Sequence, residues 1–230
     1  MYCHHCGTQV AAGVRFCPSC GQSVSAAGAL TTSVPVPWTP RSGVEAQTGQ
    51  WLGEGWRLVT ADLGNYALIT LVFILLNGVP FIQGALIAGF HVFTMKKLAG
   101  SRAEFSDFFT GFNFFIPTLV ASLLIGLFTF AGALFCIIPG LVIAAMYKFT
   151  FLFIVDRRMD FWPAMQASHS VVRNDYFGFT MFLILLLLVN LLGLVCCVVG
   201  LLVSVPVTFA AITVAYQELV GFDPQTPERV

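Results

Sequence analysis

Residues 177–217 read FGFTMFLILLLLVNLLGLVCCVVGLLVSVPVTFAAITVAYQ and contain no charged side chain. Two further blocks, residues 58–98 and 113–155, are also predominantly apolar and about as long. Because a transmembrane helix needs about 20 apolar residues, each block of about 40 fits a helical hairpin better than one long helix. The sequence therefore predicts an all-α polytopic membrane domain over residues 50–220, with six transmembrane helices arranged as three hairpins.

Helix-breaking residues stand near the middle of each block. They are residues 77–80 (Asn-Gly-Val-Pro) in the first block, Pro139 and Gly140 in the second, and Gly193 and Gly200 in the third. Glycine and proline at these points favour turns between paired helices. The two helices of the first block would be the shortest, and a re-entrant first block is the alternative.

The composition independently indicates a membrane protein. Hydrophobic residues make up 57% of the 230 residues and charged residues only 10%, whereas soluble domains are about one quarter charged. Phenylalanine alone occurs 23 times. The formal net charge is zero, so the chain as a whole has no electrostatic attraction for nucleic acid.

Basic residues are confined to one side of the three blocks. The turns expected near residues 77–83, 133–140 and 194–201 contain no charge. By the positive-inside rule, the connections between blocks and both termini are cytoplasmic, including a short tail over residues 221–230, and the protein belongs to the cytoplasmic (inner) membrane. The basic residues that flank the blocks are Arg57, Lys96, Lys97, Arg102, Arg157, Arg158 and Arg173.

A short amphipathic segment precedes each hairpin. These segments cover residues 51–63, 104–112 and 161–177, and their starts recur at intervals of roughly 55 residues. Helices of this kind lie in the membrane interface, where Trp51, Trp56 and Trp162 would form an aromatic belt.

Local capping signals mark where two of these segments begin. Ser101 and Glu104 have the spacing of a capping box, and Asp160 is a favourable N-cap residue. The phenylalanines that follow, at positions 105, 108, 109 and 112, have the spacing of one face of an α-helix. The segments are therefore expected to be interfacial α-helices.

Two cysteine knuckles open the chain, Cys3-His4-His5-Cys6 and Cys17-Pro18-Ser19-Cys20. Two C-x2-C pairs supply four thiolates, which is the tetrahedral ligand set that Zn²⁺ prefers. Ordinary buried or disulfide-bonded cysteines are the alternative, and His4 or His5 could substitute as a ligand. The spacing favours one structural zinc held by Cys3, Cys6, Cys17 and Cys20.

The knuckles resemble the zinc-ribbon domain found at the N-terminus of many prokaryotic membrane proteins. The resemblance covers residues 1–22 and implies a structural zinc on the four cysteines. A closed four-thiolate site leaves no position for substrate, so the ribbon, assigned to residues 1–24, is not expected to be catalytic. It contains one basic residue, Arg15, which favours a protein partner over nucleic acid. Residues 25–49 are rich in small residues and proline and are expected to form a flexible linker.

The apolar part also resembles a group of bacterial membrane proteins and the membrane domain attached to some glycerophosphodiester phosphodiesterases. The residues that carry the resemblance are Ile138-Pro139-Gly140 at the start of a span and an amphipathic helix after it. The resemblance implies a six-helix bundle. It brings no catalytic residue, because the phosphodiesterase catalytic domain is absent from these residues.

Few polar side chains lie inside the expected spans. Lys148 stands in the second half of the fourth span, and a charge inside a membrane is a functional-site hypothesis by default. Its ammonium group could instead snorkel to the cytoplasmic headgroups or contact a polar neighbour, which is the interpretation we prefer. Asn77, His91 and Asn190 are expected to form hydrogen bonds between helices. Cys136, Cys196 and Cys197 are expected to fill apolar space, with a disulfide as the alternative.

The features together predict a membrane scaffold or assembly component that contacts the lipid bilayer and uses a cytosolic zinc ribbon to bind another protein. The alternative is a permease for small solutes or lipids that uses the helical bundle around Lys148. No hydrolase or phosphate-binding motif occurs, so no enzyme activity is predicted.

Overall fold

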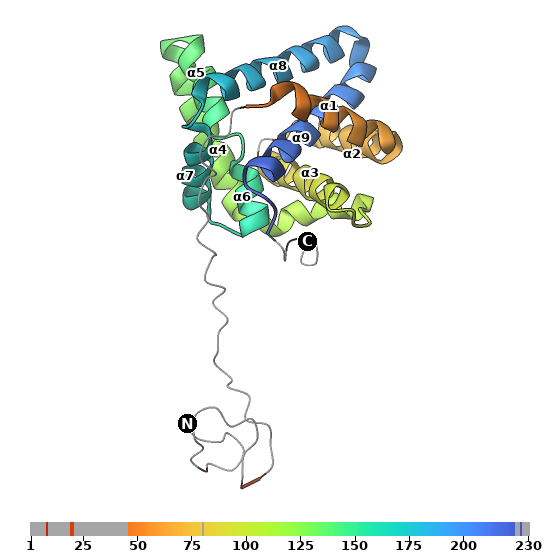
Figure 1. Cartoon of the computed structure of the whole chain (residues 1–230), viewed down its shortest axis with the longest axis vertical. Helices are drawn as coiled ribbons and strands as arrows, with labels where there is room; N and C mark the ends of the chain where they lie inside the picture. Colours follow the sequence, from red (N-terminus) through yellow and green to blue (C-terminus); the bar gives the residue numbers. More distant parts are fainter. Residues whose placement is uncertain (1–7, 9–18, 21–45, 80, 224–225, 227–230) are drawn as a thin grey trace. The chain divides into compact units, whose positions relative to one another are not determined.

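The computed structural model describes residues 8, 19–20, 46–79, 81–223 and 226. The chain divides into two compact units, Met1–Trp38 and Thr39–Val230. Nearly all described residues belong to the second unit, so the expected ribbon (1–24) and linker (25–49) lie mostly outside the described residues. Between residues 46 and 223, the described chain is helical and has no strand (Figure 1). The helices are α1 Thr48–Ala61, α2 Leu63–Leu76, α3 Gln83–Leu98, the 3₁₀ helix η1 Phe105–Phe114, α4 Phe115–Phe135, α5 Ile137–Met146, α6 Thr150–Arg157, α7 Phe161–Val172, α8 Tyr176–Val195 and α9 Cys197–Leu219.

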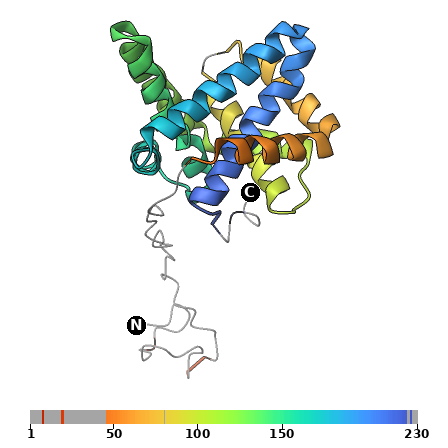
Figure 2. The same cartoon turned by 45° about the horizontal axis from the view of Figure 1, so that its top comes forward.

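Helix α9 lies at the centre of the bundle, where it contacts α1, α2, α3 and α8 (Figures 1 and 2). Its second half is mostly buried, and every residue from Ala210 to Tyr216 is buried. Helix α1 crosses it closely, because a Cβ atom placed on Gly55 would stand 2.8 Å from the backbone nitrogen of Ala211. Residues 177–217 therefore contribute to the core of the bundle as well as to two membrane-length helices.

Four helical segments are long and apolar enough to cross a membrane: Phe105–Phe135, Ile137–Arg157, Tyr176–Val195 and Val199–Leu219. They correspond to the second and third predicted hairpins. The six expected spans are not confirmed, because α2 and α3 have only 14 and 16 residues. Helices of this length reach about 21–24 Å, short of a hydrocarbon core of about 30 Å.

The first block is therefore different from the other two. The turn predicted near residues 77–83 does separate α2 from α3. The helices α1 and α2 meet at an angle of 101°. The described chain has five membrane spans if this bent pair is counted as one span, and four if it is not. Helix α3 is buried along most of its length against η1, α4 and α9. These lengths fit the re-entrant alternative for the first block.

The two membrane-length hairpins close at glycine contacts. A Cβ atom on Gly140 would lie 3.0 Å from the backbone of Ala133, where α4 and α5 meet. In the α8–α9 hairpin, a Cβ atom on Gly200 would overlap the carbonyl group of Gly193. Small residues at these positions let two helix backbones approach directly, which is how helices associate inside lipid.

The segment before α4 forms a 3₁₀ helix, and the α-helical spacing expected for its phenylalanines is wrong. With three residues per turn, Phe105, Phe108 and Gly111 share one face. That face approaches α3 closely, since Cβ atoms on Gly89 and Gly111 would overlap Phe108 and Ala85 backbone atoms. The capping box also differs from the prediction, because the Asp107 carboxylate accepts from the Glu104 backbone N–H at 2.8 Å.

Trp51 was expected in an interfacial aromatic belt, and its place in the structure differs. Its side chain is fully buried, and its indole N–H donates to the Glu218 carboxylate at 2.6 Å. Its ring also packs against Phe179 and Phe182 of α8. Trp56 and Trp162 are each about half exposed, at 54% and 51%, as belt residues would be. Trp51 therefore joins α1 to α8 and α9.

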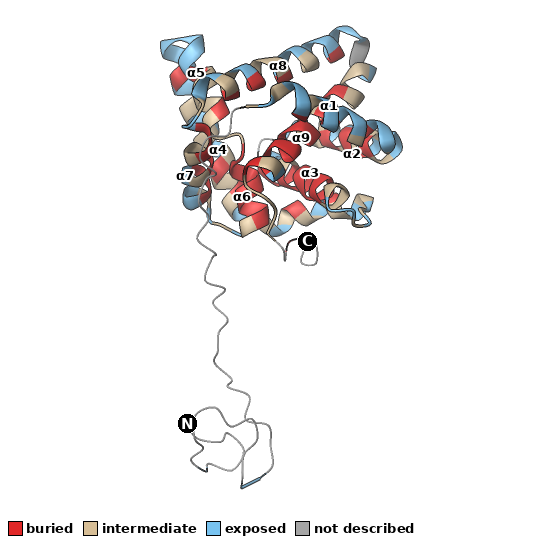
Figure 3. Ribbon diagram, in the orientation of Figure 1, coloured by how far each residue is buried: buried red, intermediate tan, exposed pale blue. Residues whose placement is uncertain are grey.

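Many large apolar side chains of α4, α5 and α8 are exposed. Figure 3 shows exposed positions of α5 and α8 in pale blue. At the ends of the two hairpins, Phe135 is 92% exposed and Val195 is 75% exposed. Soluble monomers rarely expose an apolar surface of this extent, because its contact with water is unfavourable. Contact of the same surface with lipid chains has no such free-energy cost. The surface therefore agrees with a multi-pass membrane protein.

Candidate functional site

Lys148 lies in a break of the span Ile137–Arg157. Helix α5 ends at Met146, helix α6 begins at Thr150, and residues 147–149 form a turn between them. The sequence placed Lys148 within a continuous helix, since no glycine or proline marks this position. A helix broken inside a membrane domain frees backbone groups that the protein must satisfy internally.

Ser168 of α7 satisfies two of these backbone groups. Its hydroxyl donates to the Met146 carbonyl oxygen at 2.7 Å and accepts from the Phe149 N–H at 3.2 Å. The side chain is fully buried, so water cannot replace either bond. Ser168 therefore stabilises the break from a neighbouring helix, and nothing in the local sequence around Lys148 indicates this.

His91 of α3 is a further buried polar side chain of the bundle. The ring is 2% exposed, and its Nδ1 atom lies 2.9 Å from the Thr213 hydroxyl of α9. Thr213 directs its one hydroxyl hydrogen to the Phe209 carbonyl oxygen at 2.8 Å. Its oxygen therefore accepts from Nδ1–H of the ring.

The first turn of α6 presents buried donors at the same break. Thr150 is fully buried, and its hydroxyl oxygen has no hydrogen-bond partner among the described residues. The next two amides, of Phe151 and Leu152, cannot bond within α6 and donate to no described backbone or side-chain group. Both residues are at most 8% exposed. No described acidic residue forms an ion pair with Lys148.

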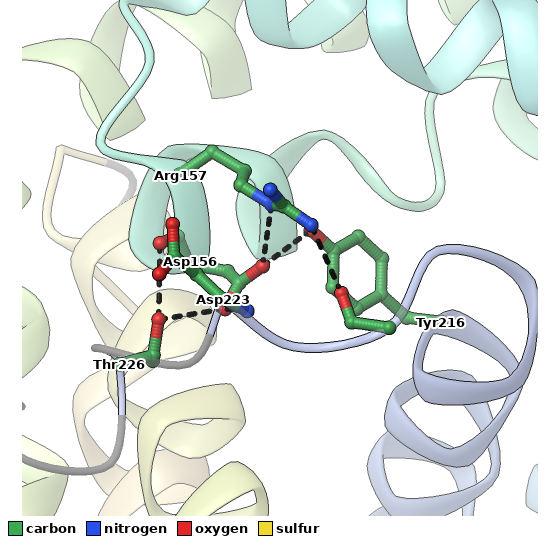
Figure 4. A network of polar contacts seen from close by, with 6 residues as sticks. Asp156, Arg157, Tyr216, Asp223 and Thr226 are labelled. Carbon is green, nitrogen blue, oxygen red and sulfur yellow. Dashed lines mark hydrogen bonds and ion pairs between the residues drawn. The ribbon is translucent and has the colours of Figure 1, made fainter. Parts of the chain in front are cut away.

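A second polar cluster, at the other end of α6, is fully satisfied (Figure 4). The Asp156 carboxylate is wholly buried and accepts from the Tyr216 hydroxyl at 2.9 Å and from Arg157 Nε at 3.1 Å. It also accepts from the Asp223 N–H at 3.0 Å and the Thr226 hydroxyl at 2.8 Å. This Asp156 cluster joins α6, α9 and the chain after α9, and its complete pairing indicates a structural role.

The other predicted intramembrane polar residues have mixed outcomes. Hydrogen bonds between helices are confirmed for His91 and for Asn190, whose amide donates to Thr208 at 2.7 Å and accepts from Ser204 at 3.2 Å. The prediction for Asn77 is wrong. This residue is exposed at the end of α2, and its side chain forms no hydrogen bond with a described residue.

Of the predicted zinc ligands, only Cys20 is described, in an exposed turn. Cys3, Cys6 and Cys17 lie outside the described residues, and no cluster of His, Cys, Asp and Glu suited to a metal occurs within those described. Cys136 and Cys196 are exposed at the hairpin ends and form no disulfide, so they do not fill buried apolar space as expected. The side chain of Cys197 is not described.

Residues 2–24 match the zinc-ribbon domain. The chain is also 28% identical, over 193 residues, to uncharacterized proteins of Mycobacterium bovis and of two strains of Mycobacterium tuberculosis. The match covers 84% of this chain and 56% of each relative, so the chain spans little more than half the length of the curated relatives it matches. No solved structure matches the chain.

These comparisons bear on both resemblances drawn from the sequence. The zinc-ribbon domain at the N-terminus is confirmed, and with it the implication of a structural zinc. None of the comparisons supports the similarity to the membrane domain of glycerophosphodiester phosphodiesterases. The ribbon and the apolar helices together fit a membrane protein that carries a zinc-ribbon module.

Proposed function

We propose that this protein is an integral membrane scaffold or assembly component that binds another protein through a cytosolic zinc ribbon. The observation that carries the proposal is the combination of a zinc-ribbon domain with a closely packed, membrane-length helical bundle. The central helix α9 contacts four neighbouring helices, and glycine contacts hold both long hairpins. Such a bundle anchors a module at a membrane surface.

The ribbon is proposed to hold one structural Zn²⁺ on Cys3, Cys6, Cys17 and Cys20. Four thiolates complete a tetrahedral site, so no position remains for a reacting water or substrate. A segment of this size cannot bury enough apolar surface to fold alone, and metal binding therefore supplies its folding free energy.

The partner is proposed to be a protein. Residues 1–24 contain one arginine, Arg15, and no lysine, whereas a nucleic-acid surface needs a cluster of basic side chains. The ribbon is expected in the cytosol, where its thiols stay reduced and available to zinc.

The topology can be tested with reporter fusions. A reporter after Val230 should be active only as a cytoplasmic reporter, and one inserted at Gly200 only as an external reporter. Four spans and six spans both return the C-terminus to the side of the N-terminus, whereas five spans do not. A C-terminus on the opposite side from the N-terminus would show that the bent α1–α2 pair crosses the membrane.

The interaction role can be tested by affinity purification in mild detergent, with the full chain compared with a chain lacking residues 1–24. We expect one protein to copurify stoichiometrically with the full chain and to be lost with the truncated one. Cys17→Ser is the matched control because it removes a zinc ligand and leaves the length unchanged. If the same partners copurify with all three forms, the ribbon is not the interaction module.

The break at Lys148 favours a second candidate, a permease for small solutes or lipids. Discontinuous helices with charged side chains at mid-membrane depth are typical of transport sites. A transport activity that depends on Lys148 and persists without residues 1–24 would place this function ahead of the scaffold.

A further inference from the structure

We propose that the break between α5 and α6 binds the carboxylate group of a small organic acid or a fatty acid. The site consists of the Lys148 ammonium group, the Thr150 hydroxyl, and the backbone N–H groups of Phe151 and Leu152. It is independent of the zinc ribbon and of the scaffold function.

The first argument is the number of unsatisfied donors. Buried polar groups in native proteins nearly always have a hydrogen-bond partner, and an unpaired one requires an explanation. Among the described residues, the Thr150 hydroxyl and the amides of Phe151 and Leu152 have no acceptor. Every one of these groups lies within the first turn of α6, so one acceptor group at this point would satisfy them together.

The second argument is electrostatic. Lys148 adds a positive charge beside the N-terminus of α6, where the helix dipole also favours an anion. No described carboxylate forms an ion pair with it. His91 donates its Nδ1 hydrogen to Thr213, and a histidine ring carries no negative charge in either protonation state, so it does not balance Lys148.

Charge and donor count select the class of anion. A carboxylate has one negative charge, which Lys148 neutralises, and two oxygens with about four lone-pair positions for the four donors. A phosphate dianion would leave one negative charge unbalanced in a buried site, which costs considerably more free energy. A monocarboxylate therefore fits better than phosphate.

The depth of the site leaves two sources of the carboxylate. Lys148 precedes Arg157, at the end of the span, by nine residues, or about 13 Å of helix. This places the site below the level of lipid headgroups. A small water-soluble acid would enter as a transported solute, and a fatty acid would reach the same group from the acyl region.

Binding can be measured on the full chain in phosphatidylcholine nanodiscs. The thermal unfolding midpoint is recorded against sodium acetate, sodium oleate and sodium phosphate, with sodium chloride at equal ionic strength as reference. A ligand that binds only the native state raises the free energy of unfolding by RT ln(1 + [L]/Kd), so the rise of the midpoint with ligand concentration gives a dissociation constant. Stabilisation by acetate that follows this dependence indicates a soluble acid, and stabilisation by oleate alone indicates a fatty acid.

Three variants test the assignment of residues. Lys148→Met should weaken carboxylate binding by about tenfold or more, and Thr150→Val by about two- to tenfold, because a charged and a neutral hydrogen bond are lost. Thr70→Val is the matched control, since Thr70 is equally buried but its hydroxyl donates to the Tyr66 carbonyl oxygen within α2. It should bind as the parent does. Because Thr150→Val keeps the β-branched shape, it remains informative if Lys148→Met fails to fold.

Three results would overturn the proposal. The first is no stabilisation by either carboxylate beyond that of sodium chloride at equal ionic strength. The second is tighter binding of phosphate than of acetate and oleate, which would exclude the carboxylate class. The third is carboxylate binding that Lys148→Met and Thr150→Val leave unchanged, which would place the ligand elsewhere.

Discussion

Replacing Tyr216 with phenylalanine tests whether the Asp156 cluster stabilises the bundle. The change removes one hydroxyl group and keeps the ring, which packs against Phe149 and Phe153. The lost bond runs from the Tyr216 hydroxyl to a fully buried carboxylate at 2.9 Å. Hydrogen bonds to charged groups contribute about 1.5–3 kcal/mol, and water cannot reach this oxygen to replace the bond. We therefore expect Tyr216→Phe to lower the free energy of unfolding by about 1.5–3 kcal/mol.

The assay is equilibrium unfolding in mixed micelles, followed by far-UV circular dichroism. Tyr176→Phe is the matched control, because its hydroxyl bonds the His169 ring at 2.8 Å in an exposed position. It should cost less than about 1 kcal/mol, as is usual for an exposed hydrogen bond. Equal effects of the two substitutions would contradict the argument from burial. A Tyr216→Phe variant as stable as the parent would show that the cluster does not hold α9 and the following chain to α6.

Three further predictions concern packing, the metal and pH. Gly89→Ala should destabilise the bundle by about 1–3 kcal/mol in the same assay, because the added methyl group would overlap the Phe108 backbone. Gly126→Ala is the control: its methyl group has open space, so the change should be neutral or stabilising. Cys17→Ser should reduce zinc below one ion per chain by elemental analysis while the membrane domain still inserts, and a parent protein without zinc in reducing buffer would refute the site. Burial alone would raise the pKa of Asp62, but hydrogen bonds from Asn65 and Lys97 outweigh burial and lower this pKa below the ordinary 3.8. The contribution of Asp62 to stability is therefore complete above pH 3.8 and is lost as the pH falls through the lowered pKa. Asp62→Asn should remove this part of the acid dependence, and unchanged acid unfolding curves would contradict it.

Much of the architecture could be predicted because its causes are local in the sequence. Apolar length predicted membrane-crossing helices, and glycine or proline predicted the turns after Leu76, Phe135 and Val195. A short helix, α7, precedes the long α8–α9 hairpin as the spacing indicated, whereas α1 and α2 have 14 residues each, so the three expected copies are not alike. The spacing of the N-terminal cysteines predicted the zinc-ribbon domain, because ligand geometry demands short knuckles.

The number of membrane-length helices could not be obtained in this way. A block of about 40 apolar residues accommodates two spans only if its turn is short. In the first block the chain bends again at Asp62, which shortens α2 to 14 residues. Helix α1 packs across α9 before this bend, and that contact joins Gly55 to Ala211, distant in the sequence.

By itself, then, the sequence determined the class of protein, the positions of most helices and the ligands proposed for zinc. Only the tertiary structure decided which polar groups are paired. At the break near Lys148, the Ser168 hydroxyl accepts from the Phe149 amide, which lies 19 residues earlier in the chain. In the Asp156 cluster, Tyr216 and Thr226 lie 60 and 70 residues after the aspartate to which they donate. The length of an apolar segment can be counted along the sequence, whereas a hydrogen bond between helices forms only where two particular helix faces are in contact. The same reason explains why the unpaired donors of α6 become visible only once the bundle is assembled.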